Sequence, residues 1–266
     1  MINGMKTAAQ MYSVREEAER NLPETLKQLK SFGYDGIELA GLVGRTPAEL
    51  RALADDIGLE IFSAHVPLSA EARDYTELGC AYLGIGWVEE GCPGKPGYEQ
   101  HRKRMEELAA DCVRQGMTLL YHNHDMEFAK WDGLYHLDRF LADIPDMQLE
   151  LDTCWANVGG EDPAAYLSQY AGRAPVVHLK DFYMPGKKPT HVYSRIGVAL
   201  ENQDASDGLF ELRPLGQGQQ DIPGLARASA EVGAKWLVVE QDAPSQGKTA
   251  LECMRLSLEY LQSIAE

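Results

Sequence analysis

Short apolar runs alternate with amphipathic stretches along the whole chain. Several of the runs are almost continuously apolar, as parallel strands covered on both faces are. We expect eight strands, at Thr7–Ser13, Gly36–Leu39, Glu60–His65, Ala81–Trp87, Met117–Asn123, Gln148–Thr153, Pro175–Lys180 and Trp236–Glu240. Eight strands that alternate with helices, without a linker between them, predict an α/β protein with a single (β/α)8 TIM barrel.

Capping signals mark where helices begin between these strands. Asn21-Leu-Pro-Glu24 and Thr46-Pro-Ala-Glu49 each place a side-chain acceptor three residues before a glutamate, which is the capping-box pattern. A doubly wound sheet is the alternative architecture, but no glycine-rich turn follows the first strand; Tyr12-Ser-Val-Arg-Glu-Glu17 stands there instead.

The length and one long connection refine this expectation. The 266 residues suit a TIM barrel, which takes about 250, so we expect one domain over residues 1–266. Residues 182–221 separate the seventh strand from its helix, and they carry Lys187, Lys188, His191, Arg195 and Arg213. Connections of this length are usually functional, so we expect a lid over the active site.

Charge and composition exclude several classes of protein. The formal net charge of −16 repels polyanions, so we expect no nucleic-acid partner. No run of about 18 apolar residues occurs, so we expect no membrane span, and we see no signal peptide. The five cysteines are scattered without a CxxC pair, which favours reduced thiols in a soluble, cytoplasmic protein. The oligomeric state stays open, a homo-oligomer included.

Polar residues close the otherwise apolar strands, at the end of the barrel where active sites lie. Unpaired burial of such groups costs several kcal/mol, so we expect them to have partners. Two glutamates, an aspartate and a histidine would suit Mn, Mg, Co or Zn. The candidate groups are Glu38, His65, His122, His124, Glu127, Asp152, His178, Lys180 and Glu240.

A series of short motifs at these strand ends resembles the sugar phosphate isomerase/epimerase family, the xylose isomerase-like TIM barrels. Relatives in that family include ketose 3-epimerases and inosose dehydratase. The motifs are His122-Asn-His-Asp-Met-Glu-Phe128, Leu151-Asp-Thr-Cys-Trp155, His178-Leu-Lys-Asp181, Leu215-Gly-Gln-Gly218 and Val239-Glu240.

The resemblance implies a divalent metal held by Glu127, Asp152, His178 and Glu240. Family members differ in how far the first of these glutamates lies past its strand, so His122 or His124 is the alternative to Glu127. Relatives with endonuclease activity carry a histidine where this chain has Trp155. That departure removes a ligand expected of a three-zinc DNA-repair site.

The resemblance also implies a reaction on a small sugar or sugar derivative, phosphorylated or not. The metal would polarise a carbonyl and stabilise an enediolate, while Glu127 and Glu240 move a proton on opposite faces. We expect the remaining candidates to bind substrate: Glu38, His65, His122, His124, Trp155, Lys180 and Arg195.

Other interpretations compete with this one. A lyase on the same scaffold, such as an inosose-type dehydratase or a keto-glycoside-cleaving enzyme, would use the same residues. A sugar-binding barrel without turnover is the alternative of another class. Individually, Asp152 could be a helix N-cap, His178 a structural histidine, Glu240 an ion-pair partner and Glu127 a loop carboxylate.

Overall fold

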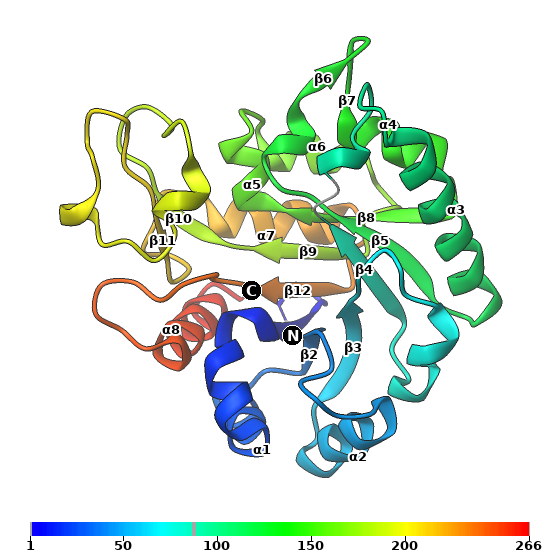
Figure 1. Ribbon diagram of the computed structural model, residues 1–266. Coiled ribbons are helices and arrows are strands. Elements are labelled where there is room, and N and C mark those ends of the chain that lie inside the picture. The colour runs from blue at the N-terminus through cyan, green and yellow to red at the C-terminus, as the bar shows by residue number, and fades with distance from the viewer. Residues whose placement is uncertain (1, 87–88, 266) are drawn as a thin grey trace.

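Eight parallel strands close into a barrel in the computed structural model, which describes residues 2–86 and 89–265 (Figure 1). Around the barrel the strands follow the order β1-β12-β9-β8-β5-β4-β3-β2. The expected (β/α)8 architecture is therefore confirmed. The barrel strands are β1 (Lys6–Gln10), β2 (Gly36–Ala40), β3 (Glu60–His65), β4 (Tyr82–Gly86), β5 (Thr118–His122), β8 (Met147–Asp152), β9 (Val176–Leu179) and β12 (Trp236–Val239).

The first strand is shorter than the apolar pattern suggests. It ends at Gln10, and Met11–Val14 form a 3-10 turn, because the side chain of Gln10 accepts a hydrogen bond from the main-chain N–H of Tyr12 at 3.0 Å. Trp87, the expected last residue of the fourth strand, lies outside the described residues.

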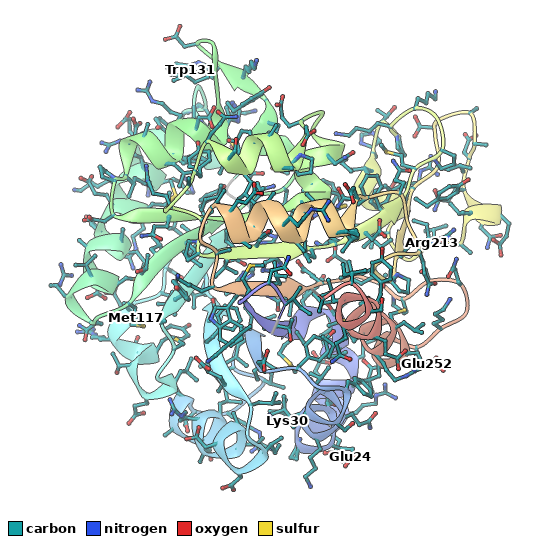
Figure 2. The ribbon with its side chains drawn as sticks, turned by 180° about the vertical axis from the view of Figure 1, so that it is seen from behind. Glu24, Lys30, Met117, Trp131, Arg213 and Glu252 are labelled. Carbon is teal, nitrogen blue, oxygen red and sulfur yellow. The ribbon has the colours of Figure 1, made fainter. Side chains whose placement is uncertain are left out.

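Helices surround the barrel, and their polar side chains face outward, as Glu24, Lys30 and Glu252 do in Figure 2. No helix in the described part of the chain combines the length and apolar character that a bilayer crossing requires. The helices are α1 (Arg15–Phe32), α2 (Pro47–Ile57), α3 (Tyr98–Arg114), α4 (His136–Asp143), α5 (Thr153–Val158), α6 (Pro163–Ser168), α7 (Ile222–Glu231) and α8 (Ala250–Ser263).

Both expected capping sites act as caps. Thr46 and Glu49 form a complete capping box at the start of α2. Asn21 lies within α1 at a kink, where its φ of −160° and ψ of 82° are not helical, and its side chain accepts from the N–H of Glu24 at 3.2 Å. Asn21 therefore starts a second helical stretch inside α1.

Short elements decorate this frame. One hairpin, β6 (Lys130–Trp131) with β7 (Leu134–Tyr135), projects from the barrel, and Figure 2 labels its Trp131. A second antiparallel pair, β10 (Asp181–Tyr183) with β11 (Glu211–Arg213), lies beyond the carboxyl ends of β9 and β12, with its connecting loops in yellow in Figure 1.

The expected lid is a packed substructure rather than an open loop. Its apolar side chains Phe182, Val192 and Phe210 form a cluster with Cys154 and Trp155 of α5. This burial gives residues 182–221 a small core of their own.

One carboxylate fixes the base of this segment. The side chain of Asp181 accepts four main-chain N–H groups, from Phe182 at 2.9 Å, Gly216 at 3.0 Å, Gly218 at 2.9 Å and Gln220 at 3.1 Å. Only glycine fits at position 218, because a Cβ there would lie 2.1 Å from Oδ1 of Asp181.

Candidate metal and active site

The barrel strands deliver acidic, imidazole and amine groups to one mouth. In a strand every second side chain shares a face, so Glu150 and Asp152 of β8 both point into the barrel. On the neighbouring strand β9, His178 also points into the barrel, and so does Lys180, the first residue after that strand. A cavity of about 900 Å³ lies at this mouth. Of these side chains, Lys180 lines the cavity, while Glu150, Asp152 and His178 are fully buried.

Four buried side chains form what we call the mouth group: His122, Asp152, His178 and Glu240. Each offers a ligand atom, and these atoms all lie within 4.8 Å of one another. Nδ1 of His178 lies 2.8 Å from Oε2 of Glu240, and Nε2 of His122 lies 3.9 Å from Oδ2 of Asp152. The four groups are close enough to hold a single cation.

Asp152 has a second role. Its Oδ1 accepts the main-chain N–H of Trp155 at 2.9 Å and so caps the N-terminus of α5. The interpretation of Asp152 as a helix N-cap is confirmed, and its other carboxylate oxygen, Oδ2, lies 3.0 Å from Nζ of Lys180 and 3.9 Å from Nε2 of His122.

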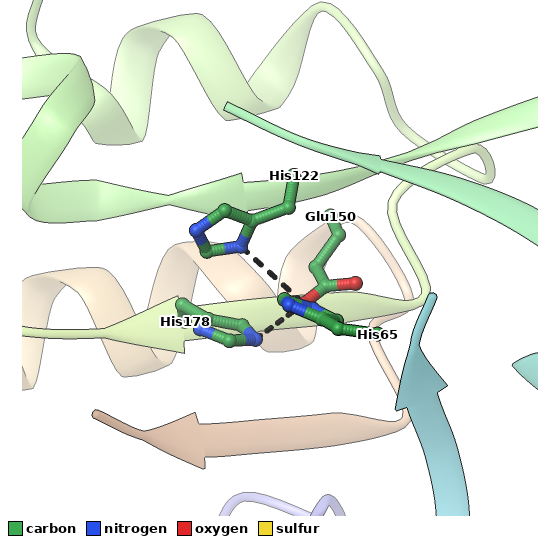
Figure 3. Close-up of side chains that lie close together, drawn as sticks. All are labelled: His65, His122, Glu150 and His178. Atoms are coloured by element: carbon green, nitrogen blue, oxygen red, sulfur yellow. Dashed lines mark hydrogen bonds and ion pairs between the residues drawn. The ribbon is translucent and has the colours of Figure 1, made fainter. Parts of the chain in front are cut away.

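Two further buried carboxylates, Glu38 and Glu150, contact the opposite edge of the His178 ring; we call them the inner carboxylates. Oε2 of Glu38 lies 2.7 Å from Nε2 of His178, and Oε1 of Glu150 contacts the same nitrogen. Figure 3 shows Glu150 between His178, His122 and His65. Its Oε1 lies 2.9 Å from Nε2 of His65 and 3.4 Å from Nδ1 of His122.

A second grouping of ligand types, His65, His122, Glu150 and His178, thus adjoins the mouth group. Within it the His65–Glu150 separation is that of a hydrogen bond. Glu38 and Glu150 accept hydrogen bonds from the imidazoles of His178 and His65, and carboxylates in such positions orient histidine ligands in metal sites.

Lys180 is buried among carboxylates. Its Nζ lies 3.0 Å from Oδ2 of Asp152, 3.1 Å from Oε2 of Glu240 and 3.1 Å from Oδ1 of Asp242. Burial alone would lower the pKa of Lys180, but the three carboxylates raise it well above its ordinary value. Lys180 is consequently a fixed positive charge at the mouth.

The pKa values of the two carboxylates Glu240 and Asp242 are shifted in opposite directions. Burial would raise the pKa of Glu240, yet the charges of Lys180 and His178 hold it well below its ordinary value. Burial, with the nearby charges of Glu240 and Asp152, raises the pKa of Asp242 to about 7 despite Lys180. Glu240 is therefore ionised as a ligand must be.

Glu127, expected as the fourth ligand, lies elsewhere. It is fully buried, and it accepts the hydroxyl of Tyr121 at 2.9 Å and the main-chain N–H of His124 at 2.8 Å. It lies in the 3-10 turn Met126–Phe128, belongs to neither group of neighbouring ligand types, and contacts Tyr121, whose ring packs on Phe140 of α4. The structure places His122, not Glu127, beside the other three ligand candidates.

The residues expected to bind substrate divide into two sets. His65, His122, His124 and Lys180 line the cavity. Trp155 is fully buried and packs on Tyr193 at 4.9 Å between ring centroids, so it supports the cavity wall rather than facing a ligand.

Two further candidates also lie away from the cavity surface. Arg195 pairs with Asp207 at 2.9 Å within the lid segment. Glu38 is fully buried against His178.

Sequence reasoning assigned no role to Glu150 or Asp242. Both lie two residues from a ligand candidate on the same strand or strand end, so the alternation that points to Asp152 and Glu240 also points to them. The alternation of side chains along a strand therefore predicts that Glu150 and Asp242 point into the barrel. It does not predict which residues they contact there.

Comparisons with known proteins agree with the barrel fold. The family model of the xylose isomerase-like TIM barrel matches residues 26–263. An inosose dehydratase of Geobacillus kaustophilus is 27% identical over 190 residues, which cover 59% of this chain and 61% of that relative, less than two thirds of its length.

Two solved structures show the likeness of the fold. A sugar phosphate isomerase/epimerase from Parabacteroides distasonis superimposes with a TM-score of 0.74 and 22% identity, over 99% of this chain and 96% of the other. The IolI protein, solved with a zinc atom bound, gives a TM-score of 0.69 and 16% identity over 98% of each chain.

Proposed function

Because this chain belongs to the xylose isomerase-like TIM barrel family, we propose that it is a divalent-metal-dependent carbohydrate isomerase or epimerase that moves a proton next to a carbonyl group. The observation that carries the proposal is the mouth group, which joins two imidazoles and two carboxylates within 4.8 Å and of which His122 and Glu240 line a cavity of about 900 Å³. Membership places the chain among carbohydrate isomerases, epimerases and dehydratases; the choice of reaction and the need for a metal are our inference.

The residues of the mouth group fit a divalent cation. The four buried carboxylates of Glu38, Glu150, Asp152 and Glu240 outnumber Lys180 and the two imidazoles of His65 and His178, whose pKa values the carboxylates raise, and Oε1 of Glu38 and Oε2 of Glu150 have no hydrogen-bond partner. Two imidazole nitrogens favour Zn, Mn or Co over Mg, which prefers oxygen ligands. The zinc in the IolI structure supports this choice. When bound, the cation supplies Lewis-acid chemistry to a substrate carbonyl.

Lys180 orients the substrate in this proposal. Its ammonium group lines the cavity and its three N–H groups face three carboxylates, so a substrate oxygen would accept a hydrogen bond from it by displacing one of them, with no solvent shell to remove first. The buried Trp155 ring lies 5.1 Å from the same nitrogen and keeps water from the other side.

Glu240 and His124 are the groups we propose as proton carriers. Glu240 follows β12 and His124 follows β5, three strands apart in the barrel, so they flank the cavity from different sides. Removal of a proton on one side and its return on the other inverts a carbon, while transfer between neighbouring carbons isomerises the sugar. Glu127 supports His124 by accepting its main-chain N–H.

The charges around the cavity favour an uncharged sugar over a phosphorylated one. Lys180 is neutralised by carboxylates, Lys188 pairs with Asp125 and Arg195 pairs with Asp207. Of the cations that line the cavity, Arg15 donates to the main-chain oxygens of Tyr12 and Asp242, and the carboxylates of Glu16, Glu240 and Asp242 line the same cavity and would repel a phosphate. We therefore assign a keto-sugar as the substrate class.

Dehydration is the second candidate, and the 27% identity to an inosose dehydratase favours it. The same proton removal leads to loss of water when the next carbon bears a hydroxyl group. A product lighter by one water distinguishes this reaction from isomerisation.

The test is proton exchange. A panel of unphosphorylated keto-sugars is incubated with Zn-, Mn- or Co-loaded protein in deuterated buffer, and NMR follows the hydrogen next to the carbonyl. We expect exchange with wild-type protein and with Asp162→Ala, a control at the cap of α6, and none with Asp152→Ala. Absence of exchange and of product across the panel and the three metals would refute the proposal.

A further inference from the structure

An exposed aromatic ring stands in the wall of the cavity. Tyr12, in the turn after β1, is 44% exposed, while large aromatic residues usually bury their apolar body. It lines the same cavity as His122 and Glu240 of the mouth group, so a single ligand can reach both.

The ring is fixed in place rather than free to move. The guanidinium of Arg15 lies 4.1 Å from the centroid of the Tyr12 ring, in a cation–π contact. Nη1 of Arg15 donates to the main-chain oxygen of Tyr12 at 2.7 Å and to that of Asp242 at 2.8 Å. Arg15 thus covers one face of the ring and ties it to the loop after β12, which lowers the entropic cost of stacking a ligand on the ring.

The cavity is larger than one sugar needs. A hexose has about 12 non-hydrogen atoms, and it displaces at most about 360 Å³ if each atom takes no more than one water's share of about 30 Å³. The cavity measures about 900 Å³. More than half of it is therefore left when one ring occupies the mouth group.

The chemistry of the remaining space differs from that of the mouth. Besides Tyr12, it is bordered by the apolar or small residues Ile196 and Gly197 of the lid segment and Ala243 and Pro244 after β12. Glu16 and Asp242 also line the cavity and would repel an anion. The space suits a neutral group with an apolar face.

We propose that Tyr12, backed by Arg15, forms a second subsite that binds a neutral ring linked to the reacting sugar. The substrate is then a glycoside or disaccharide-sized ketone, with its reacting carbonyl at the mouth group and its second ring stacked on Tyr12. This inference rests on the proposed function for the position of the reacting sugar, but the subsite itself is defined by Tyr12 and the cavity.

The experiment compares one-ring and two-ring probes by saturation-transfer NMR and calorimetry on the zinc-loaded protein. The pairs are fructose with isomaltulose and glucose with cellobiose. We expect a two-ring probe to bind about tenfold more tightly than its one-ring partner. Tyr12→Ala should remove that difference without changing one-ring affinity, and Tyr12→Phe should keep it. Thermal unfolding confirms that the variants fold.

The outcomes separate this inference from the proposed function. If no two-ring probe gains affinity, or the gain persists in Tyr12→Ala, the second subsite is refuted, whether or not keto-sugars exchange their protons. If the Tyr12-dependent gain is found while no ketone exchanges, the subsite stands and the proposed reaction fails. Tighter binding of glucose 6-phosphate than of cellobiose would also refute the second subsite, because that subsite is proposed to bind a neutral ring.

Discussion

Nε2 of His178 lies 2.7 Å from Oε2 of Glu38, on the ring edge opposite to the one that faces Glu240. Glu38 is itself held by the side-chain amide of Gln10 at 2.9 Å. Burial would lower the pKa of His178, but Glu150, Glu38 and Glu240 raise it well above its ordinary value, so both ring nitrogens carry protons in the metal-free protein. A cation bound at Nδ1 would replace the proton there and leave the Nε2–H on Glu38. Glu38 is therefore a positioning residue for His178.

Glu38→Gln removes the charge that supports His178. We expect the zinc affinity to fall about tenfold, the lower end of what outer-shell substitutions cost, with the fold retained. Competition with a chelating dye measures the affinity. Glu60→Gln, on the exposed end of the neighbouring strand, is the control. Equal affinities for both variants would contradict this role.

Asp152 allows its two roles to be separated. Asp152→Ala removes the metal-directed oxygen and the cap of α5, while Asp152→Asn keeps an acceptor for the N–H of Trp155. We expect both variants to lose bound metal, and only Asp152→Ala to lose a further ~1 kcal/mol of stability through the lost cap. Metal analysis after dialysis and urea unfolding of the metal-free proteins provide the two readouts; retained metal in Asp152→Asn would exclude Asp152 as a ligand.

Lys180 balances buried charge. Lys180→Met leaves Asp152, Glu240 and Asp242 without their cation, and breaking a buried pair in this way costs about 3–5 kcal/mol. We expect the metal-free variant to unfold at much lower urea than wild type, and added zinc to recover part of the loss. Lys27→Met, at an exposed site on α1, should unfold like wild type. A metal-free Lys180→Met protein as stable as wild type would show that the ion pairs are not needed.

Glu127 predicts a pH dependence of stability. Burial raises its pKa from an ordinary 4.5 to about 7, although hydrogen bonds from His124 and Tyr121 oppose the rise. Between these values the folded state holds a proton that the unfolded state has released, so the free energy of unfolding falls as pH rises from 4.5 to 7. The upper bound of this loss is about 3.4 kcal/mol, at 1.36 kcal/mol for each pKa unit.

Urea unfolding of metal-free protein across this pH range, compared with Glu127→Gln, isolates the contribution. In Glu127→Gln the free energy of unfolding should fall less between pH 4.5 and 7 than in wild type. It should also bind zinc as wild type does, since Glu127 lies outside the mouth group. A large loss of zinc would instead restore Glu127 to the ligand set.

The barrel could be predicted from the sequence because apolar periodicity sets strand position and side-chain direction together. Asp152, His178 and Glu240 end adjacent strands, so their convergence follows from topology. The direction of Glu127 does not follow, because it depends on the 3-10 turn after β5. The contacts of His178 with Glu38 and Glu150 depend on packing across the barrel, between residues far apart along the chain.

The anchoring of the lid by Asp181 has an evolutionary consequence. Because Asp181 grips main-chain N–H groups, the attachment of the segment tolerates change in most of its side chains, apart from Gly218. Tyr193 and Ile196, which face the cavity, can then vary while the catalytic floor stays intact. Exchange of residues 182–221 as a unit, by natural mutation or by recombination in the laboratory, can thus change the substrate preference.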